Sequence, residues 1–117
     1  MVKIYGIPNC NSVKKGLDFL RNNNIDFVFH DFKKQSLTKE KFDEWNSIFE
    51  NTKLINRSGT TFKQLTEEQK SLLSEINFSF DFLISKLSVI KRPIVETSSG
   101  YLIGFDENEW IKVILNQ

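Results

Sequence analysis

The sequence is poor in the residue types that build disulfides and metal centres. It contains one cysteine and one histidine among 117 residues, and its five glycines form no phosphate-binding loop. The lone thiol, Cys10, cannot form an internal disulfide and suits a reducing compartment, so we expect a cytoplasmic protein. One cysteine and one histidine, without carboxylates at ligand spacing, are too few for a metal site.

Long apolar runs and a charge imbalance are also missing. The longest apolar runs are a few residues, far shorter than the roughly 20 residues of a membrane-spanning helix. The net charge is +1 and no basic stripe is present, which argues against direct nucleic-acid binding. Met1–Gly6 lacks the apolar stretch of a signal peptide and instead predicts a strand. These absences exclude both a membrane and a nucleic acid as expected partners.

The chain does contain enough apolar material for one core, since 39% of its residues are hydrophobic and eleven are phenylalanine. Its first third predicts a strand, a helix and a second strand. The helix carries Val13, Leu17 and Leu20 at helical spacing on one face. Such a βαβ unit predicts two parallel strands joined by a right-handed crossover. The expected ranges are Val2–Tyr5, about Asn11 or Ser12 to Asn22–Asn24, and Ile25–Phe32.

The middle of the chain predicts helices. Thr38 fits an N-cap, and Thr66–Gln69 fits a capping box that opens a short helix. A further helix is expected over Phe78–Leu87. Its expected inward residues are Phe82, Leu83 and Leu87.

The last third predicts a β-hairpin of Pro93–Glu96 with Tyr101–Gly104, and then a helix that Asp106 and Glu109 begin in a capping-box pattern. The order βαβ, helices, ββα is the thioredoxin order with an enlarged middle. It predicts an α/β fold with a mixed central sheet flanked by helices. We expect one domain over residues 1–117, with a core of residues 1–35 and 88–117 and a helical insert of about residues 36–87.

Cys10 is the strongest candidate for chemistry. It lies between the turn Pro8–Asn9 and the expected helix start at Asn11 or Ser12, so its sulfur should lie beside free backbone N–H groups. Those donors and the helix dipole favour a thiolate, and Lys14 adds positive potential. The alternative is a buried cysteine that acts as a small apolar side chain. The strand-to-helix loop favours the reactive interpretation, because such loops are exposed.

Position 13 is valine, so Cys10–Val13 has the frame of a Cys-x-x-Cys motif without the second thiol. A dithiol cycle is therefore excluded. Redox turnover would require an external thiol to resolve a mixed disulfide with Cys10.

Two arginines are candidates for binding an anion. Arg92 precedes Pro93 at the start of an expected strand, where an X-Pro bond can be cis. Its planar guanidinium suits a carboxylate, a sulfonate or an oxyanion. The alternative is a plain surface pair of Lys91 and Arg92. Arg57, before a glycine turn, is by itself more typical of a solvated loop residue than of a ligand-binding one.

His30 lies in the expected second strand between Phe29 and Asp31. A Cys–His pair would require this imidazole to reach Cys10, which the spacing does not indicate. A structural or surface histidine is therefore the preferred interpretation.

Five segments carry a family resemblance that spans nearly the whole chain. They are Tyr5–Lys15, Phe29–Phe32, Asn56–Thr61, Ile90–Ile94 and Ile103–Glu107. Together they resemble the arsenate reductase (ArsC)/Spx family, and most closely its small YffB-like subgroup. Several separate motifs in the right order are far more specific than any one of them.

The resemblance implies a thioredoxin-like core with a helical insert, a redox-active cysteine at Cys10 and a cis-proline at Pro93. The arsenate reductases of this family hold their oxyanion with three arginines, and Arg57 and Arg92 match two of them by motif. The third falls after the last strand, where this chain has Gly104–Glu107 and no arginine. The acidic residues there argue against arsenate reduction. The Spx regulators often carry a Cys-x-x-Cys switch, which this chain lacks.

We therefore predict a monothiol, glutathione-dependent thiol–disulfide reductase with Cys10 as its nucleophile. No cofactor or metal is expected to be bound, and glutathione is the expected co-substrate for a small thiol or disulfide substrate. Substrate or anion binding is expected from Arg57, Arg92, Asn11, Ser12 and Pro93, with Lys14 as support for the thiolate. The alternatives are a nonenzymatic, Spx-like module that binds a protein partner and, third, a true arsenate reductase.

Overall fold

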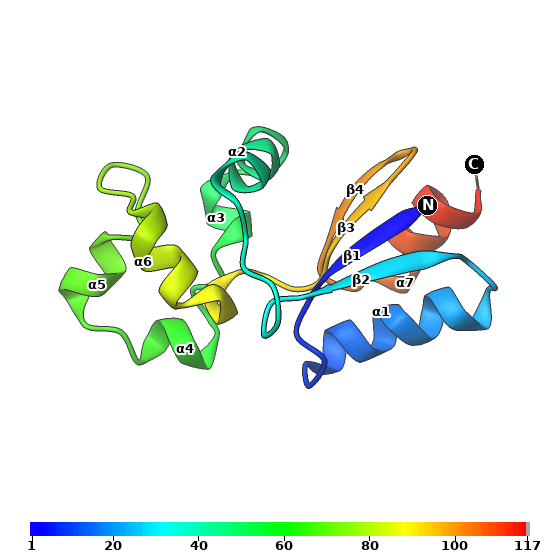
Figure 1. Cartoon of the computed structure of the whole chain (residues 1–117), viewed down its shortest axis with the longest axis horizontal. Helices are drawn as coiled ribbons and strands as arrows, with labels where there is room; N and C mark the ends of the chain where they lie inside the picture. The colour runs from blue at the N-terminus through cyan, green and yellow to red at the C-terminus, as the bar shows by residue number, and fades with distance from the viewer. Residues whose placement is uncertain (117) are drawn as a thin grey trace. The chain divides into compact units, whose positions relative to one another are not determined.

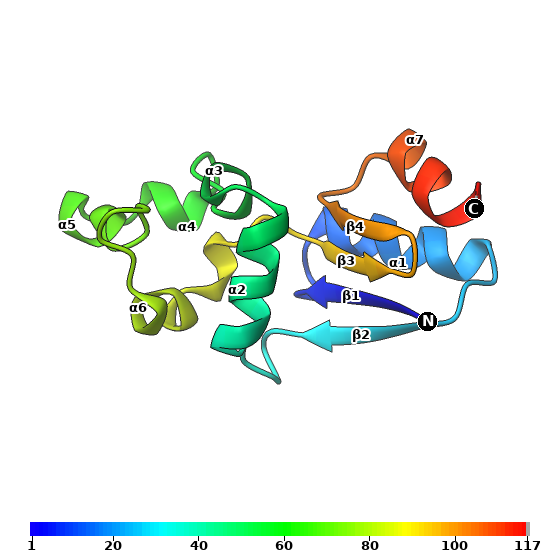
Figure 2. The same ribbon diagram turned by 90° about the horizontal axis from the view of Figure 1, so that it is seen from above.

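A mixed four-stranded sheet is built from the two ends of the chain. The computed structural model describes residues 1–116. The strands are β1 (Val2–Gly6), β2 (Phe27–Asp31), β3 (Ile94–Thr97) and β4 (Gly100–Ile103). β1 pairs in parallel with β2 and antiparallel with β3, and β3 pairs antiparallel with β4. The order across the sheet is β2-β1-β3-β4 (Figure 2), which confirms the predicted mixed α/β sheet.

The chain divides into two compact units. Met1–Gln35 and residues 92–116 form the first, which we call the sheet unit. Ser36–Lys91 form the second, the helical insert. Cys10 and Arg92 belong to the sheet unit, and Arg57 belongs to the helical insert.

α1 (Asn11–Asn22) connects β1 with β2 and lies against one face of the sheet (Figure 1). It ends near the predicted asparagines, and Asn24 takes the left-handed conformation with φ 55°. The predicted start of the second strand at Ile25 is wrong by two residues. The Ile25 N–H donates to the Leu20 carbonyl at 2.9 Å, so this residue still closes the end of the helix rather than joining the ladder.

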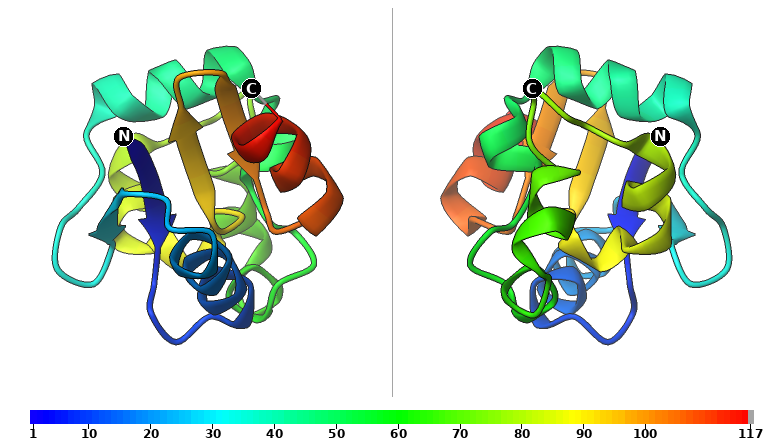
Figure 3. Two further views of the ribbon diagram at one scale, coloured as in Figure 1. Left: turned by 90° about the vertical axis from the view of Figure 1, so that its right-hand side faces the viewer. Right: turned by 90° about the vertical axis from the view of Figure 1, so that its left-hand side faces the viewer.

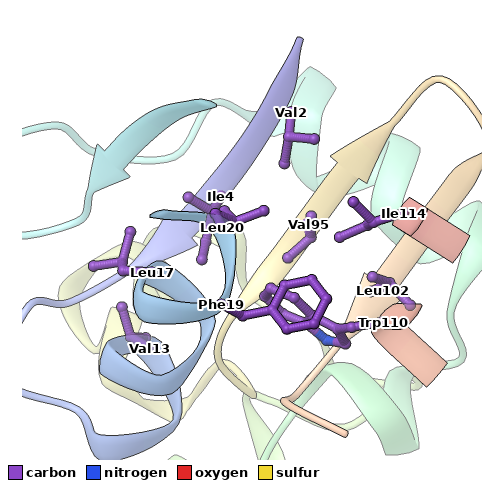
Figure 4. Close-up of a cluster of buried hydrophobic side chains, with 10 residues drawn as sticks. All are labelled: Val2, Ile4, Val13, Leu17, Phe19, Leu20, Val95, Leu102, Trp110 and Ile114. Carbon is purple, nitrogen blue, oxygen red and sulfur yellow. The ribbon is translucent and has the colours of Figure 1, made fainter. Parts of the chain in front are cut away.

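The core of the sheet unit lies on the face that α1 covers (Figure 4). The C-terminal helix α7 (Glu107–Trp110) and the π-helical turn η2 (Ile111–Leu115) lie on the same face (Figure 3). Trp110 is fully buried, packs edge-on against Phe19 at 5.5 Å between ring centroids, and donates from Nε1 to the Gly104 carbonyl at 3.1 Å. The other buried members of this core are Val2, Ile4, Val13, Leu17, Leu20, Val95, Leu102 and Ile114.

The predicted hairpin and final helix are both present. The loop is shorter by one residue on each side than predicted, because the Thr97 hydroxyl accepts from the Ser99 N–H at 3.0 Å and donates to the Gly100 carbonyl at 2.9 Å. The last helix begins where predicted, since the Asp106 carboxylate accepts from the Glu109 N–H at 3.2 Å.

Short helices make up the helical insert (Figure 1). They are α2 (Lys39–Ile48), α3 (Asn51–Leu54), α4 (Thr60–Lys63), α5 (Glu67–Ser71), α6 (Phe80–Ser85) and the 3₁₀ turn η1 (Leu87–Val89). The predicted N-cap Thr38 accepts from the Lys41 N–H at 3.2 Å, and the predicted capping box of Thr66 and Gln69 is formed in both directions. Both local predictions are confirmed.

The predicted helix over Phe78–Leu87 is too long at both ends. Ser79 is its N-cap and accepts from the Phe82 N–H at 3.1 Å, so the helix begins at Phe80. It ends at Ser85, where the backbone tightens into η1. Of the three residues expected to face inward, Leu83 alone is fully buried, whereas Phe82 and Leu87 are half-buried.

The close packing of α1 against α7 makes Gly16 a sensitive position. A Cβ atom at Gly16 would lie 2.6 Å from Trp110 Cη2 and 3.2 Å from Ile4 Cδ1. Alanine gains about 1 kcal/mol of helix propensity, but overpacking a core costs about 1–3 kcal/mol. We expect Gly16→Ala to lower the free energy of unfolding in urea by about 1 kcal/mol. The exposed neighbour Lys15→Ala should change it by less than about 0.5 kcal/mol, and a more stable Gly16→Ala protein would contradict this packing.

Candidate functional site

Cys10 occupies the N-cap position of α1, with φ −95° and ψ 130°. Its carbonyl accepts the first hydrogen bond of the helix, from the Lys14 N–H at 2.9 Å, and its own N–H donates to the Ile7 carbonyl at 3.3 Å. No side chain caps this helix, and its first turn holds no acidic residue. The first-turn N–H groups and the helix dipole therefore favour a negative charge beside the thiol.

The Cys10 side chain is half-buried and packs against the apolar core of the sheet unit. Part of the alternative interpretation therefore holds, since the thiol does contact apolar side chains. It also remains accessible to a reagent, because half-burial leaves part of the residue in solvent. The thiol is held in one place by the core and remains open to chemistry.

The sequence predicts that Asn11 and Ser12 bind a substrate or anion and that Lys14 supports the thiolate. Asn11 is exposed and Ser12 is half-buried, and both lie in the first turn of α1. Lys14 is exposed and forms no ion pair within residues 1–116. Its ammonium is thus not neutralised by a carboxylate of the described chain.

Val13 is completely buried, on the face of α1 that packs on the sheet. A Cβ atom at Gly6 would lie 2.6 Å from Val13 Cγ2, which shows how closely this side chain approaches the end of β1. The second position of the Cys-x-x-Cys frame is therefore occupied by a core residue. Cys10 is the single thiol of the chain.

The register of the sheet brings the start of β3 to the end at which Cys10 lies. Tyr5 lies opposite Ile94, so β1 leads toward Cys10 at the same end where the chain enters β3. The Arg92–Pro93 peptide bond is cis, as the resemblance implied, and Pro93 is buried. Cys10, Arg92 and Pro93 thus share one end of the sheet.

Arg92 carries a polar atom with no partner. The residue is half-buried, and its Nη1 is buried without a hydrogen bond to any group of residues 1–116. A guanidinium keeps its charge in proteins, and an unsatisfied buried donor costs about 1–3 kcal/mol. Arg92 therefore brings an incompletely paired cationic group to the end of the sheet that holds the thiol.

The segment after β4 reaches this end of the sheet as well. The Gly104 N–H donates to the Pro93 carbonyl at 2.8 Å. Phe105 packs against Trp110 with 4.9 Å between ring centroids, and the next residues carry the exposed carboxylates of Asp106 and Glu107. The structure thus has carboxylates rather than a third arginine after the last strand, which disfavours a small multiply charged oxyanion there.

Arg57 is held inside the helical insert. Its Nη2 donates to Asn51 Oδ1 at 2.7 Å, and its Cζ lies 5.9 Å from the centroid of the Phe62 ring. The residue is exposed. The structure therefore places Cys10 and Arg92 at one end of the sheet, whereas Arg57 has its contacts within the helical insert.

His30 packs into an aromatic cluster of the sheet unit. Its ring lies 4.9 Å from Tyr5 and 5.5 Å from Phe32 between centroids. Its Nε2 lies 3.1 Å from the Gln35 carbonyl oxygen. These contacts agree with the structural role that the sequence favours.

Asn51 lines a pocket of about 470 Å³ in the helical insert, together with Phe42, Phe78 and the Lys39–Asp43 pair. Lys39 donates to Asp43 Oδ2 at 2.8 Å, and this hydrogen bond and the negative charge of Asp43 raise the pKa of Lys39.

A metal-binding cluster and a membrane-spanning helix are the two other features considered for residues 1–116. No group of three or more His, Cys, Asp or Glu side chains in residues 1–116 is arranged to hold a metal ion. Over the same residues, no helix combines the length and the apolar composition that a membrane span requires.

Comparison with known families decides where this arrangement belongs. A model of the ArsC family matches residues 5–113, which include both the sheet unit and the helical insert. The chain belongs to the ArsC family. Its fold is the thioredoxin-like α/β fold predicted from the sequence.

Relatives of this ArsC-family chain resemble it over nearly its whole length. An uncharacterized protein of Haemophilus influenzae is 34% identical over 110 residues, which cover 94% of this chain and 96% of the relative. The global transcriptional regulator Spx of Lactiplantibacillus plantarum is 28% identical, over 93% of this chain and 83% of the relative. The solved structure of the YFFB protein has a TM-score of 0.88 at 30% identity, and the match covers 97% of this chain and 99% of that one.

Sequence reasoning missed Asn51, which holds the Arg57 guanidinium of this ArsC-family chain. Asn51 is the one amide or charged residue buried within residues 1–116, with 5% of its surface exposed. An asparagine at the start of a short helix has no distinctive local pattern, so only its partners reveal it.

The unpartnered Arg92 nitrogen leads to a stability prediction for this ArsC-family chain. Arg92→Met keeps most of the apolar stem and removes the unsatisfied donor, so we expect the free energy of unfolding to rise by about 1 kcal/mol. Lys91→Met, at the exposed position before it, should change the value by less than about 0.5 kcal/mol. Urea denaturation at neutral pH measures both variants. A loss of stability in Arg92→Met alone would show that this guanidinium is satisfied in solution.

Proposed function

We propose that this chain is a monothiol, glutathione-dependent thiol–disulfide reductase with Cys10 as its nucleophile. One observation carries the proposal: the only thiol of the chain shares an end of the sheet with a buried guanidinium nitrogen that has no partner among residues 1–116. A thiolate and a cationic donor together suit a disulfide that carries an anionic group.

The reaction balances without a bound cofactor. The Cys10 thiolate attacks the glutathione sulfur of a mixed disulfide R–S–S–G, forms Cys10–S–S–G and releases R–S⁻, which takes a proton from water. A second glutathione thiolate then attacks the glutathione sulfur of this adduct, forms oxidised glutathione and releases the Cys10 thiolate. The substrate is reduced by two electrons, and two glutathione moieties leave as one disulfide.

The other site residues have separate roles in this proposal. Arg92 binds a carboxylate of glutathione or of the substrate, because its guanidinium can donate two parallel hydrogen bonds. The first-turn N–H groups of Asn11 and Ser12 support the negative charge of the thiolate, and Lys14 adds to the positive potential. Pro93 shapes the loop that faces the thiol. Arg57 is the second anion-binding arginine.

Glutathione is the proposed co-substrate, and the proposed substrate is a small or glutathionylated disulfide. A compartment rich in glutathione, such as the cytoplasm, is where a lone reactive thiol can be regenerated. Arsenate is disfavoured as a substrate, because Asp106 and Glu107 follow the last strand where the arsenate reductases of the family have an arginine.

A nonenzymatic partner-binding module is the second candidate function. It is favoured by the similarity to the Spx regulator, which extends over 93% of this chain. In that case Cys10 would be a sensor or a relic, and turnover of a disulfide would not depend on it. The two candidates differ in one measurable property, which is catalytic turnover.

Reduction of bis(2-hydroxyethyl) disulfide by glutathione tests the proposed enzyme. We expect turnover by the purified chain and none above the uncatalysed rate by Cys10→Ser. Intact-mass analysis after treatment with oxidised glutathione should show one glutathione adduct, and the Cys10→Ser protein should show none. Adduct formation without turnover would favour the partner-binding module, and the same assay with arsenate tests the third candidate.

Arg92→Ala tests the anion site beside the thiol. A charge-assisted hydrogen bond contributes about 1.5–3 kcal/mol, so we expect kcat/KM with glutathionylated substrates to fall about ten- to a hundredfold. Arg92→Lys should recover part of this loss, because it keeps the charge and loses the planar fork. Lys91→Ala is the matched control, since it removes a neighbouring exposed cation. Equal kinetics for Arg92→Ala and Lys91→Ala would remove Arg92 from the site.

A further inference from the structure

The pocket of about 470 Å³ in the helical insert is lined by residues of Ser36–Lys91 alone. They come from α2, from the first residue of α3, and from the segment that connects α5 with α6 and opens α6. Its volume lies within the range of about 300–1,000 Å³ that is typical of small-molecule sites. The thiol reaction proposed above uses none of the residues that line it.

Aromatic rings form the apolar wall of this pocket. Phe42 and Phe78 are stacked, with 5.0 Å between ring centroids and 3° between ring planes, and Phe80 lies 6.1 Å from Phe42. Phe42 is buried, whereas Phe78 and Phe80 are half-buried, so the wall keeps open ring surface. The faces of such rings carry partial negative charge and attract cations, and ring surfaces also pack well against another aromatic ring.

A buried amide in the pocket has one hydrogen-bonding group to spare. Asn51 is 5% exposed, its Nδ2 donates to the Leu73 carbonyl at 3.3 Å, and its Oδ1 accepts from Arg57 Nη2 at 2.7 Å. A side-chain amide has two N–H groups, so one N–H of Nδ2 is without a partner in residues 1–116. An unpaired buried donor is unfavourable. This N–H is therefore suited to an acceptor oxygen of a ligand.

The charges of the lining residues favour a cation over an anion. Lys39 donates to Asp43 at 2.8 Å, so these two charges balance each other. Glu75 is exposed and has no hydrogen bond or ion pair within residues 1–116. Arg57 does not line the pocket. One carboxylate of the lining is thus left unbalanced, and it attracts a cationic ligand and repels an anionic one.

We propose that this pocket binds a small aromatic monoamine, which carries an acceptor oxygen at one end of its ring and an ammonium group at the other. The ring packs against the phenylalanine wall, the oxygen accepts from Asn51 Nδ2, and the ammonium pairs with Glu75. A mostly apolar pocket with a few polar groups that fix orientation is the usual form of such a site. The site is independent of Cys10, so it goes beyond the proposed reductase.

Tyramine has all three groups and is the probe. Its binding to the full chain is followed by NMR, through the backbone amides and the side-chain amides of Asn46 and Asn51. We expect saturable shifts of residues in the pocket at millimolar tyramine, because a ligand of this size gains limited binding energy.

Two ligand controls separate the polar contacts. 3-(4-Hydroxyphenyl)propionate has the same ring and hydroxyl with a carboxylate in place of the amine, and it should bind at least about fivefold more weakly. Phenethylamine lacks the hydroxyl that accepts from Asn51, so it should bind about two- to tenfold more weakly than tyramine. The second comparison tests the Asn51 contact without changing a buried residue.

Glu75→Gln removes the unbalanced charge at an exposed position and should lower the affinity for tyramine about two- to fivefold. Glu68→Gln is the matched control. Glu68 is an exposed glutamate of α5 that does not line the pocket and has no partner within residues 1–116. Its variant should bind tyramine as the wild type does.

Equal affinity for tyramine and the propionate, or unchanged affinity for tyramine in Glu75→Gln, would overturn the amine site. Shifts confined to residues outside the pocket would do so too, as would no saturable shift up to about 10 mM tyramine. Each of these results leaves the proposed reductase standing, because turnover by Cys10 is measured separately. Conversely, Cys10→Ser should bind tyramine with the wild-type affinity even though it lacks the nucleophile.

Discussion

The antiparallel register of β1 and β3 is the constraint on which the candidate site depends. Ile4 lies opposite Val95, and both side chains are completely buried in the same core. A slip of one residue would turn one of these strands inside out and expose its apolar side chains. The register that buries the core also brings Cys10 and the cis Arg92–Pro93 bond to one end of the sheet. Packing on one face therefore determines that the thiol and the Arg92 guanidinium lie at the same end of the sheet.

α1 contributes both to the buried core of the sheet unit and to the surroundings of Cys10. Its inner face packs against β1 and α7, and Gly16 allows Trp110 to approach its backbone. Its first turn leaves N–H groups beside Cys10. The same inner face contains Val13, which occupies the second cysteine position of the Cys-x-x-Cys frame. Its side chain is completely buried in the core. Val13 thus packs α1 on the sheet and leaves Cys10 as the single thiol of the chain.

The two candidate arginines are held in opposite ways. Arg92 is half-buried, and its Nη1 has no hydrogen-bond partner among residues 1–116. An unpaired buried donor lowers the stability of the fold, and proteins retain destabilising groups of this kind at functional sites. Arg57 is exposed, and its direction is set by Asn51 and the Phe62 ring. One guanidinium is positioned by the fold around it and the other by a specific hydrogen bond. Arg92 Nη1 is thus left without a hydrogen-bond partner among residues 1–116, whereas Arg57 Nη2 has one in Asn51.

The sequence by itself determined the features that depend on neighbouring residues. The N-cap at Thr38, the order of the four strands, and the place of Cys10 at a helix start all follow from patterns a few residues long, whereas α3 and α4 were not predicted. Several family motifs in order also identified the fold. Only the tertiary structure decided that Arg92 Nη1 has no partner and that Asn51 joins Arg57 to the Leu73 carbonyl. The physical reason is distance along the chain: Asn51 and Leu73 are 22 residues apart, and only the folded backbone brings such groups within hydrogen-bonding range.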